Sequence, residues 1–221
     1  MKHLKVDLHI HTKYSKDGDI NPEDLVKKAV ELGFDAIGVA DHGTLKGALE
    51  TEKASKKTAR DLIVFVGQEI NTEQGEVIVY NVRSNIKENQ DMIKTCKEVK
   101  EKRGFLIIPH PFDLMRRGIG ENTDRILEYA DVVEGFNART IINRFNDKAM
   151  RFARENKIPV VVGSDAHFLN EFGKTYKLIE SDKKESEILK AIKNNKAELV
   201  MQKHDMKSGM KRGLRKIRTY F

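Results

Sequence analysis

The sequence predicts an α/β fold of one domain, in which a closed and mostly parallel barrel of strands is covered by helices. Short apolar runs typical of strands alternate with helical patterns, and the connections between them are short. The apolar runs have few polar interruptions, as expected for strands that are buried on both faces. Polar residues suited to chemistry follow six of these runs. Only a closed barrel would bring six strand ends to one rim, because an open sheet spreads them along a line.

The first half of the chain predicts strands over residues 4–10, 36–40 and 62–66. Asn21 suits an N-cap, Pro22 suits the first helical position, and two acidic residues follow, so a helix is expected to start here and to end at Gly33. A second helix is expected over about residues 45–60. Gly75 marks a turn into a further strand over residues 76–82, which is expected to pair hairpin-fashion.

The second half continues this alternation. A helix is expected near residues 87–102, with Met92, Cys96 and Val99 along one side. Strands are expected over residues 105–108, 132–136 and 159–162, separated by a short helix through 126–127 and a longer one over 140–156. A last strand–helix–strand stretch is expected over residues 175–180, 185–193 and 197–201, before a basic tail.

Length and composition bound the class of protein. The 221 residues suffice for one sizeable core, and no composition break indicates a second globular domain. Cys96 is the single cysteine, so an internal disulfide is excluded and a reducing cytoplasm is the expected setting. No apolar run approaches the roughly 20 residues that a membrane span needs. We therefore expect a soluble, cytoplasmic protein.

The net charge of +7 is concentrated in the tail. Residues 203–221 contain four lysines and three arginines against Asp205 alone, a net +6, whereas residues 1–202 carry +1. The chain is therefore divided into a barrel domain, 1–202, and a tail, 203–221. Apolar residues recur at helical spacing in the tail, which predicts a basic amphipathic helix from Ser208, packed on or beside the barrel (Met210, Leu214, Ile217, Phe221). Closing the barrel is the preferred role of this helix, and contact with nucleic acid or a membrane surface are the alternatives.

Five of the seven histidines stand at predicted strand ends: His9, His11, His42, His110 and His167. Since one residue separates His9 from His11, both project from the same face of a strand. Three carboxylates and an amide share these strand ends, and a further carboxylate lies in the first loop (Asp41, Glu69, Asn137, Asp165; Asp17). Clusters of His, Asp and Glu without Cys suit Zn, Mn or Fe. The donors outnumber the ligands of one ion, so more than one ion is expected, with a carboxylate such as Glu69 or Asp165 as the bridge.

Four of these segments form an ordered set that extends from residue 7 to residue 167. They are Asp7-Leu8-His9-Ile10-His11-Thr12, Ala40-Asp41-His42-Gly43-Thr44, Pro109-His110-Pro111 and Gly163-Ser164-Asp165-Ala166-His167. The set resembles the motifs of the PHP family (polymerase and histidinol phosphatase), in the family's order. The resemblance implies a distorted seven-stranded (β/α) barrel of the TIM-like class, with a phosphoesterase centre of two or three divalent ions.

The resemblance also implies roles for the individual ligands. A first ion would be surrounded by His9, His11, Glu69 and Asp165. Glu69 would bridge to a second ion, which His110 and Glu76 would complete. A third ion would be held by His42, His167 and Asp17. Asp165, Glu69 and His42 are the ligands expected to take part in catalysis.

Two carboxylates beside these ligands are expected to support them. Asp41 adjoins His42 and faces the other way on a regular strand, so we expect it to orient an imidazole. Asp7 stands two residues before His9 and could share its face, again in a supporting role.

Asn137 ends a strand on the rim, where it is expected to contact substrate or to support a ligand. Three arginines on loops near strand ends could clamp a phosphate (Arg116, Arg117, Arg139).

The expected reaction is the attack of a metal-activated water on phosphorus. The leading hypothesis is a metal-dependent phosphatase that acts on a small phosphomonoester or a nucleotide. A phosphodiesterase or exonuclease acting on nucleic acid is the first alternative, and the basic tail favours it. A non-catalytic RNA-binding barrel subunit is the second alternative, although such a protein is expected to have lost ligands, and this ligand set is nearly complete.

Overall fold

Strands and helices alternate along the chain as the sequence predicts. The computed structural model describes residues 2–194, 197–204 and 215–219. The strands are β1 (Lys2–Ile10), β2 (Ala36–His42), β3 (Ile63–Thr72), β4 (Gly75–Tyr80), β5 (Phe105–Ile108), β6 (Val132–Asn137), β7 (Val160–Gly163), β8 (Tyr176–Ser181), β9 (Ala197–Met201) and β10 (Arg215–Thr219). The helices are α1 (Pro22–Glu31), α2 (Lys46–Thr58), α3 (Met92–Glu101), α4 (Asn143–Glu155) and α5 (Glu185–Lys193), with two 3-10 helices, η1 (Leu114–Arg116) and η2 (Gly120–Ile126).

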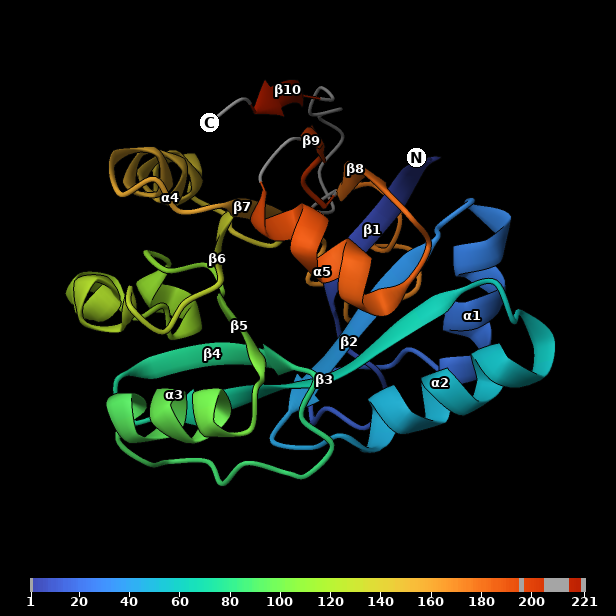
Figure 1. Cartoon of the computed structure of the whole chain (residues 1–221), viewed down its shortest axis with the longest axis horizontal. Coiled ribbons are helices and arrows are strands. Elements are labelled where there is room, and N and C mark those ends of the chain that lie inside the picture. Colours follow the sequence, from blue (N-terminus) through green and yellow to red (C-terminus); the bar gives the residue numbers. More distant parts are fainter. Residues whose placement is uncertain (1, 195–196, 205–214, 220–221) are drawn as a thin grey trace.

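The strands β1 to β7 close into a barrel. Six of them run parallel, and β4 lies antiparallel between β3 and β5 as the second strand of the predicted hairpin. A bridge between Ile10 and Ala166 joins β1 to the segment after β7. Two backbone hydrogen bonds fix this seam, from His11 N to Ala166 O (2.9 Å) and from Asp165 N to His9 O (2.7 Å). Figure 1 shows the ring of strands with helices around it, which confirms the predicted distorted TIM-like barrel. The sheet exceeds the seven predicted strands, because β8 and β9 extend it beyond β1.

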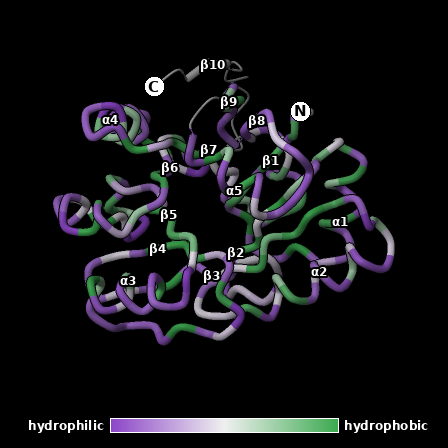
Figure 2. The backbone as a smooth tube through the Cα atoms, in the orientation of Figure 1, coloured by the Kyte–Doolittle hydropathy of each residue, from purple (hydrophilic) through white to green (hydrophobic). Residues whose placement is uncertain are grey.

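The interior of the barrel is apolar at the end where the parallel strands begin. One cluster of buried side chains takes members from all seven strands, and α5 adds Ile188 and Ile192 to it. α5 lies across the middle of the ring in Figure 1, and it follows β8, whose last residue, Ser181, pairs with the first residue of β1. Two further clusters pack the outer faces of the strands against the surrounding helices. Figure 2 shows this pattern as hydrophobic strands inside a largely hydrophilic periphery. The opposite end of the barrel is therefore left for polar side chains.

Two helices begin later than predicted, because side-chain caps and turns fix their first residues. α3 starts at Met92 and not near residue 87, since the carboxylate of Asp91 accepts a hydrogen bond from Lys94 N (3.0 Å). α4 starts at Asn143 and not at residue 140. The preceding turn is held by Asn137 Oδ1, which accepts from the backbone amides of Arg139 (2.9 Å) and Thr140 (3.3 Å). The short helix expected through residues 126–127 is the 3-10 helix η2.

The predicted C-terminal helix is wrong for residues 215–219, which form β10. This strand pairs antiparallel with β9, from Arg215 opposite Met201 to Thr219 opposite Ala197. The earlier part of the predicted helix, from Ser208 to Leu214, lies outside the described residues. Pairing satisfies the backbone groups along the free edge of β9, and this outweighs a helical spacing of apolar residues. Among the described residues, no helix has the length and apolarity needed to cross a membrane.

Candidate metal centre

A bulge in β1 directs His9 and His11 into the barrel. The pairing register between β1 and β2 shifts between Asp7 and Ile10. Earlier residues of β1 point into the apolar interior (Leu4, Val6, Leu8), so strict alternation would turn both histidines outward. The extra residue restores their inward direction and leaves Ile10 in the outer cluster with α1 and α2. The two imidazoles therefore stand directly above the apolar interior.

The first cluster consists of His9, His11, Glu69 and Asp165, the four ligands expected for the first ion. Nε2 of His11 lies 3.3 Å from Glu69 Oε2 and 3.4 Å from Asp165 Oδ1. Nε2 of His9 lies 3.5 and 3.6 Å from the same two oxygens. Both oxygens are buried and have no hydrogen-bond partner within the part of the chain that the structure describes. Two imidazole nitrogens and two unsatisfied carboxylate oxygens that converge in this way fit a cation, because burying such oxygens alone is costly.

The second cluster joins the first through Glu69. The other carboxylate oxygen, Glu69 Oε1, lies 3.2 Å from His110 Nε2, and Glu76 Oε2 lies 3.7 Å from the same nitrogen. Glu76 therefore points toward His110 and the first cluster. These three residues can converge on one ion. The two oxygens of Glu69 thus face two different clusters.

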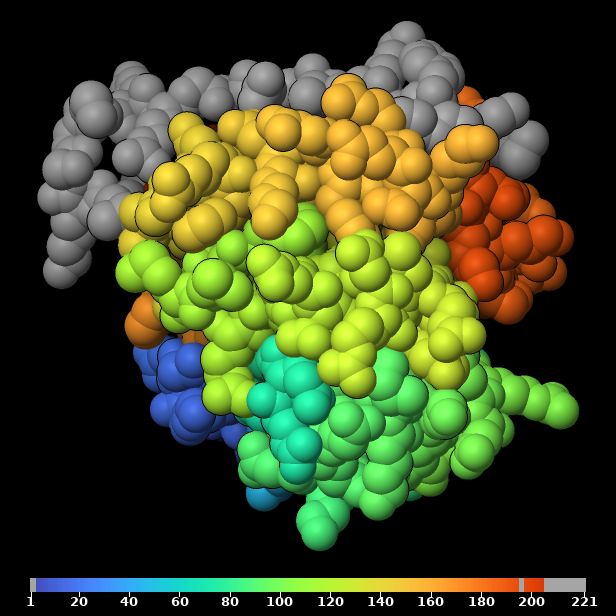
Figure 3. All heavy atoms as spheres, turned by 90° about the vertical axis from the view of Figure 1, so that its left-hand side faces the viewer, coloured from blue at the N-terminus to red at the C-terminus, as the bar shows by residue number. Residues whose placement is uncertain are grey.

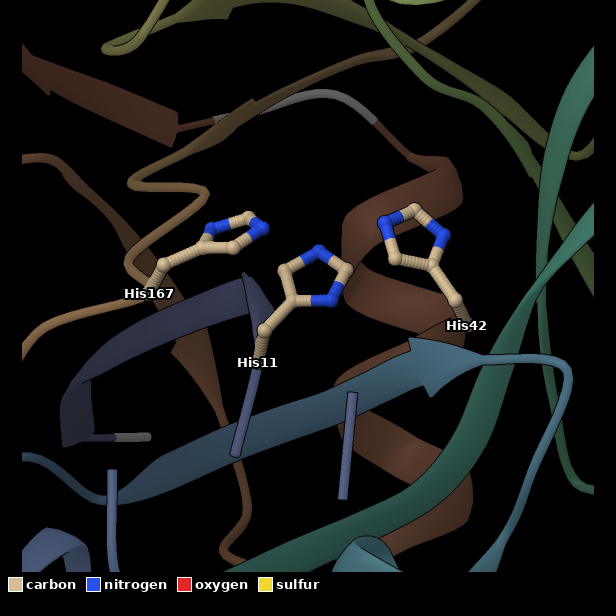
Figure 4. A group of neighbouring side chains, drawn as sticks. All are labelled: His11, His42 and His167. Atoms are coloured by element: carbon tan, nitrogen blue, oxygen red, sulfur yellow. The ribbon is translucent and has the colours of Figure 1, made fainter. Parts of the chain in front are cut away.

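The third cluster lies at the mouth of the barrel. Figure 4 shows His11 between His167 and His42, with ring centroids 4.2 and 4.8 Å from that of His11. The carboxylate of Asp17 reaches both outer histidines, at 3.3 Å from His167 Nε2 and 3.7 Å from His42 Nε2. His11 is near the first cluster too, so it stands between the first and third clusters.

Asp41 acts through Ser15 on the imidazole of His11 and on the backbone of the adjacent His42, whose amide donates to the Ser15 hydroxyl oxygen (3.0 Å). Its carboxylate accepts hydrogen bonds from Thr12 N (2.6 Å) and from the Ser15 hydroxyl (3.1 Å). The same hydroxyl lies 3.1 Å from His11 Nδ1, so Asp41 reaches the imidazole through Ser15. Asp7 makes no hydrogen bond or ion pair to an imidazole of the described chain. Its Oδ1 accepts from the backbone amides of His9 and Ser164, both at 3.2 Å.

Glu134 is a buried residue of the centre that the sequence analysis missed. Its Oε1 lies 2.8 Å from His9 Nδ1, and its Oε2 accepts from His110 N (2.8 Å) and from Asn137 Nδ2 (2.9 Å). A register shift in β6 between Glu134 and Phe136 lets Glu134 and Asn137 both turn inward. The available signal was a lone carboxylate inside the apolar run Val132–Asn137, where an unpaired charge would be unfavourable.

The predicted substrate-binding residues differ in exposure. Asn137 is fully buried and donates to Asp165 Oδ2 (2.8 Å), so it lies behind the ligand that it supports. Arg116 forms an ion pair with the same oxygen of Asp165 and donates to Asn137 Oδ1 (3.0 Å). Arg117 is half exposed and donates to Thr72 O (2.9 Å). Arg139 lies 3.7 Å from Glu171. Of the four, Arg117 and Arg139 are the freer to meet a substrate.

The protein groups alone leave the centre with strongly shifted acidities. Burial, with Glu69 and Asp165 close by, raises the pKa of Glu76 to about 9. Burial would also raise the pKa of Asp165, but Arg116 and the surrounding imidazoles hold it well below its usual value. Burial and the neighbouring His11 lower the pKa of His167 to about 4. An ionised Asp165 and a neutral His167 are the forms that bind metal, whereas Glu76 would have to lose its proton when a cation binds.

Comparison with known proteins places this geometry in a known family. The family model of the PHP domain matches residues 7–207. An uncharacterised protein of Methanocaldococcus jannaschii is 34% identical over 146 residues, which is 61% of this chain and 82% of that protein. A 5'-3' exoribonuclease of Haemophilus influenzae is 31% identical over 121 residues, 49% of this chain and 43% of the relative.

Solved structures show the same fold at low identity. A two-domain protein from Bacteroides vulgatus, which contains a predicted PHP-like metal-dependent phosphoesterase, superposes with a TM-score of 0.76 at 18% identity. The match covers 90% of this chain and 64% of that one. A protein from Bifidobacterium adolescentis, thought to be a metal-dependent phosphoesterase, gives a TM-score of 0.64 at 17% identity and covers 85% of this chain and 95% of its own.

Proposed function

Because this chain belongs to the PHP family, we propose that it is a metal-dependent phosphoesterase that hydrolyses the phosphomonoester of a small metabolite or a nucleotide. The observation that supports the proposal most is the placement of Glu69. Its Oε2 lies within 3.5 Å of ring nitrogens of His9 and His11, and its Oε1 lies 3.2 Å from His110. A carboxylate that bridges two ions needs this arrangement. The donor set suits two or three divalent ions of Zn, Mn or Fe.

Different residues of the centre would bind the ions and position the phosphate. When bound, divalent ions of this kind lower the pKa of a coordinated water toward neutrality and offset the charge on the phosphate oxygens. Glu69 and Asp165 hold the first cluster, and His42 lies between Glu69 and Asp17, 3.5 Å and 3.7 Å away. Arg117 and Arg139 stand at the rim, where a guanidinium can bind phosphate oxygens in a bidentate manner.

The nucleophile in this proposal is water, and Ser164 has a structural role. The Ser164 hydroxyl donates to His9 O (3.2 Å) and accepts from Ala166 N (3.3 Å), so it stabilises the turn after β7. An activated serine would instead need a hydrogen bond to a basic side chain. The other turn residue, Asp165, has positive φ (52°), and the Ser164 contacts help to hold that conformation.

The proposal is tested by hydrolysis after metal reconstitution. Purified protein is stripped with a chelator, loaded with Zn, Mn or Fe(II), and assayed on a panel of phosphomonoesters and on a matched diester. We expect turnover of monoesters that depends on added metal. Absence of metal-dependent turnover with every ion and every ester would refute the proposal.

An exonuclease acting on RNA is the second candidate, and one placement favours it. β9 runs parallel to β1, so its last residue, Met201, lies at the same end of the barrel as the metal centre. His204 then donates from its backbone to Ala138 O (3.2 Å), and its Nε2 lies 2.7 Å from Ser164 O. The basic tail therefore starts beside Asp165. The exoribonuclease relative points to the same substrate class, although it shares less than half of its length with this chain.

Truncation separates the two candidates. A chain that ends at His204 lacks most of the tail's cations but keeps every proposed ligand. If the substrate is RNA, the affinity for a short single-stranded RNA should fall and lose its salt dependence, because phosphate contacts by Lys and Arg are salt-dependent. If the substrate is small, hydrolysis of a nucleotide monoester should stay unchanged. RNA affinity without any hydrolysis would favour the non-catalytic alternative.

The cytoplasmic location stays a prediction from the single cysteine.

A further inference from the structure

Large apolar side chains are exposed on three consecutive loops of the barrel rim. They are Leu114 and Met115 after β5, Ile141 after β6 and Phe168 after β7, with exposed fractions of 69%, 73%, 52% and 47%. We call these four residues the apolar rim. β5, β6 and β7 are neighbours in the sheet and run parallel, so the three loops leave the same end of the barrel. The two other exposed large apolar residues of the described chain, Val30 and Leu49, lie on α1 and α2.

Each residue of the apolar rim is close in sequence to a residue of the metal centre. Met115 precedes Arg116, which is paired with Asp165. Phe168 directly follows His167, a proposed ligand. Ile141 stands two residues after Arg139. The ester group of a substrate whose phosphorus lies at the metal centre can therefore reach these loops.

The three loops are also tied to one another. Arg116 donates to Asn137 Oδ1 (3.0 Å), which links the loop after β5 to the end of β6. Glu171 Oε2 accepts from Phe168 N (3.2 Å) and lies 3.7 Å from Arg139 Nη1, which links the loops after β6 and β7. Figure 3 shows the segment after β5, in lime, packed directly below the yellow residues of α4 and its preceding turn. The apolar rim is thus one side of the mouth and not four unrelated surface residues.

The neighbouring loop after β1, whose Asp19 N donates to His167 O (2.8 Å), has a different chemistry. The loop after β1 exposes Lys13, Lys16, Asp17 and Asp19. A polar or charged ester group would be solvated well there, whereas it would gain nothing from Leu114 or Phe168. Apolar residues that gather beside a site, rather than singly over the surface, are typical of ligand contact.

We propose that the substrate's ester group carries a planar ring, an aromatic ring or a nucleobase, and that one face of this ring binds over the apolar rim. This inference rests on the proposed phosphoesterase function and names the part of the substrate that the metal centre does not bind. The phosphate would meet the metal ligands and the arginines, and the ring would cover Leu114, Met115 and Phe168. Covering one ring face with apolar side chains is expected to favour such an ester by about tenfold.

The test compares two monoesters of primary alcohols, benzyl phosphate and glycerol 1-phosphate, whose leaving groups have similar basicity. The metal-loaded protein should show a kcat/KM about tenfold higher for benzyl phosphate. The double variant Leu114→Ser/Met115→Ser and the single variant Phe168→Ser should each reduce this ratio severalfold. The control Val30→Ser/Leu49→Ser changes two other exposed apolar residues, on α1 and α2, and should leave both rates and their ratio unchanged.

The outcomes are distinct. A ratio near one in the unaltered protein would overturn the inference while the phosphoesterase function stands. The inference would also be overturned if the rim variants lowered the rates for benzyl phosphate and glycerol 1-phosphate equally, since a purely structural role has this effect. Benzylphosphonate, which is not hydrolysed, gives a second readout, because it should inhibit the unaltered protein more strongly than ethylphosphonate and should lose that advantage in Phe168→Ser. Absence of turnover of both esters while another monoester of the panel is hydrolysed would overturn the inference alone. Absence of turnover of every ester with every metal would refute both the function and the inference.

Discussion

Glu134 Oε1 lies 2.8 Å from His9 Nδ1, on the side of the imidazole that faces away from Glu69 and Asp165. The second oxygen of Glu134 accepts from the backbone of His110, so one buried carboxylate fixes ligands of two clusters. A carboxylate behind an imidazole sets its tautomer and makes the other nitrogen a better ligand. His9 is thereby prepared to offer Nε2 to a cation.

Replacing Glu134 should weaken metal binding without removing a ligand. We expect Glu134→Gln to lower metal affinity by about 10- to 100-fold, because an amide neither orients nor polarises the imidazole as a carboxylate does. Competition with a chromophoric chelator measures the affinity directly. Glu121→Gln, on the exposed surface of η2, is the control. Equal affinity in Glu134→Gln and the unaltered protein would contradict the supporting role of Glu134.

Asp17 and Asp19 provide a matched pair for the third cluster. Both are exposed and lie in the same loop, but only Asp17 reaches the imidazoles of His42 and His167. We expect Asp17→Asn to lower the metal content of the reconstituted protein by about one equivalent, because the third cluster loses its single carboxylate. Asp19→Asn should leave the content unchanged. Elemental analysis after gel filtration gives the count, and equal loss in both variants would argue against a third ion.

Loss of Asp165 should abolish catalysis. Its Oδ1 faces His9 and His11, and its Oδ2 is held by Asn137 and Arg116. Asp165→Asn keeps the size of the side chain but replaces the charged carboxylate by a neutral amide. We therefore expect kcat to fall by more than about 100-fold, with fewer than two ions retained. Steady-state kinetics and metal analysis on one preparation check both effects. Near-normal turnover would remove Asp165 from the active centre.

Lys177, which lies far from the metal centre, should make the free energy of unfolding depend on pH. Its side chain is buried in β8, where it donates to Val160 O (2.5 Å), and burial lowers its pKa to about 7. In the unfolded chain the pKa of Lys177 is about 10.4. Between about pH 7 and 10 the unfolded chain therefore binds more protons than the folded chain. Stability should therefore rise with pH across this window, by about 2 kcal/mol between pH 7 and 9.

Chemical denaturation at several pH values measures this contribution as a difference between proteins. Lys177→Met cannot titrate, so its free energy of unfolding should lack the rise that Lys177 adds. Lys190→Met, at an exposed position of α5, is the control and should keep the rise. If the free energy of unfolding changed with pH in the same way in Lys177→Met and in the unaltered protein, Lys177 would have an ordinary pKa in the folded state.

The strand ends were predictable because ligand residues interrupt apolar runs at regular places. His42, Glu69 and His110 could be assigned to one rim from alternation alone, since parallel strands of a barrel end on the same side. The bulge in β1 could not be predicted, because a period of two gives no sign of an inserted residue. Glu134 was missed for a related reason: a carboxylate in mid-strand shows its partners only when β1 and β5 are placed beside β6. β10 was missed because the tail's apolar spacing fits a helix, and only the neighbouring edge of β9 selects a strand.

The seam that closes the barrel has a consequence for how the protein opens. Its two backbone hydrogen bonds are made by His9, His11, Asp165 and Ala166, so the residues that join the ends of the barrel are also the proposed ligands or their immediate neighbour. Cations that hold these side chains would also hold the two edges of the sheet together, and loss of the cations would loosen the seam before any other part of the barrel. The amide hydrogens of His11 and Asp165 should then exchange with solvent faster after chelation than those in the middle of β2 or β3. Metal loading and ring closure would be a single cooperative event in this protein.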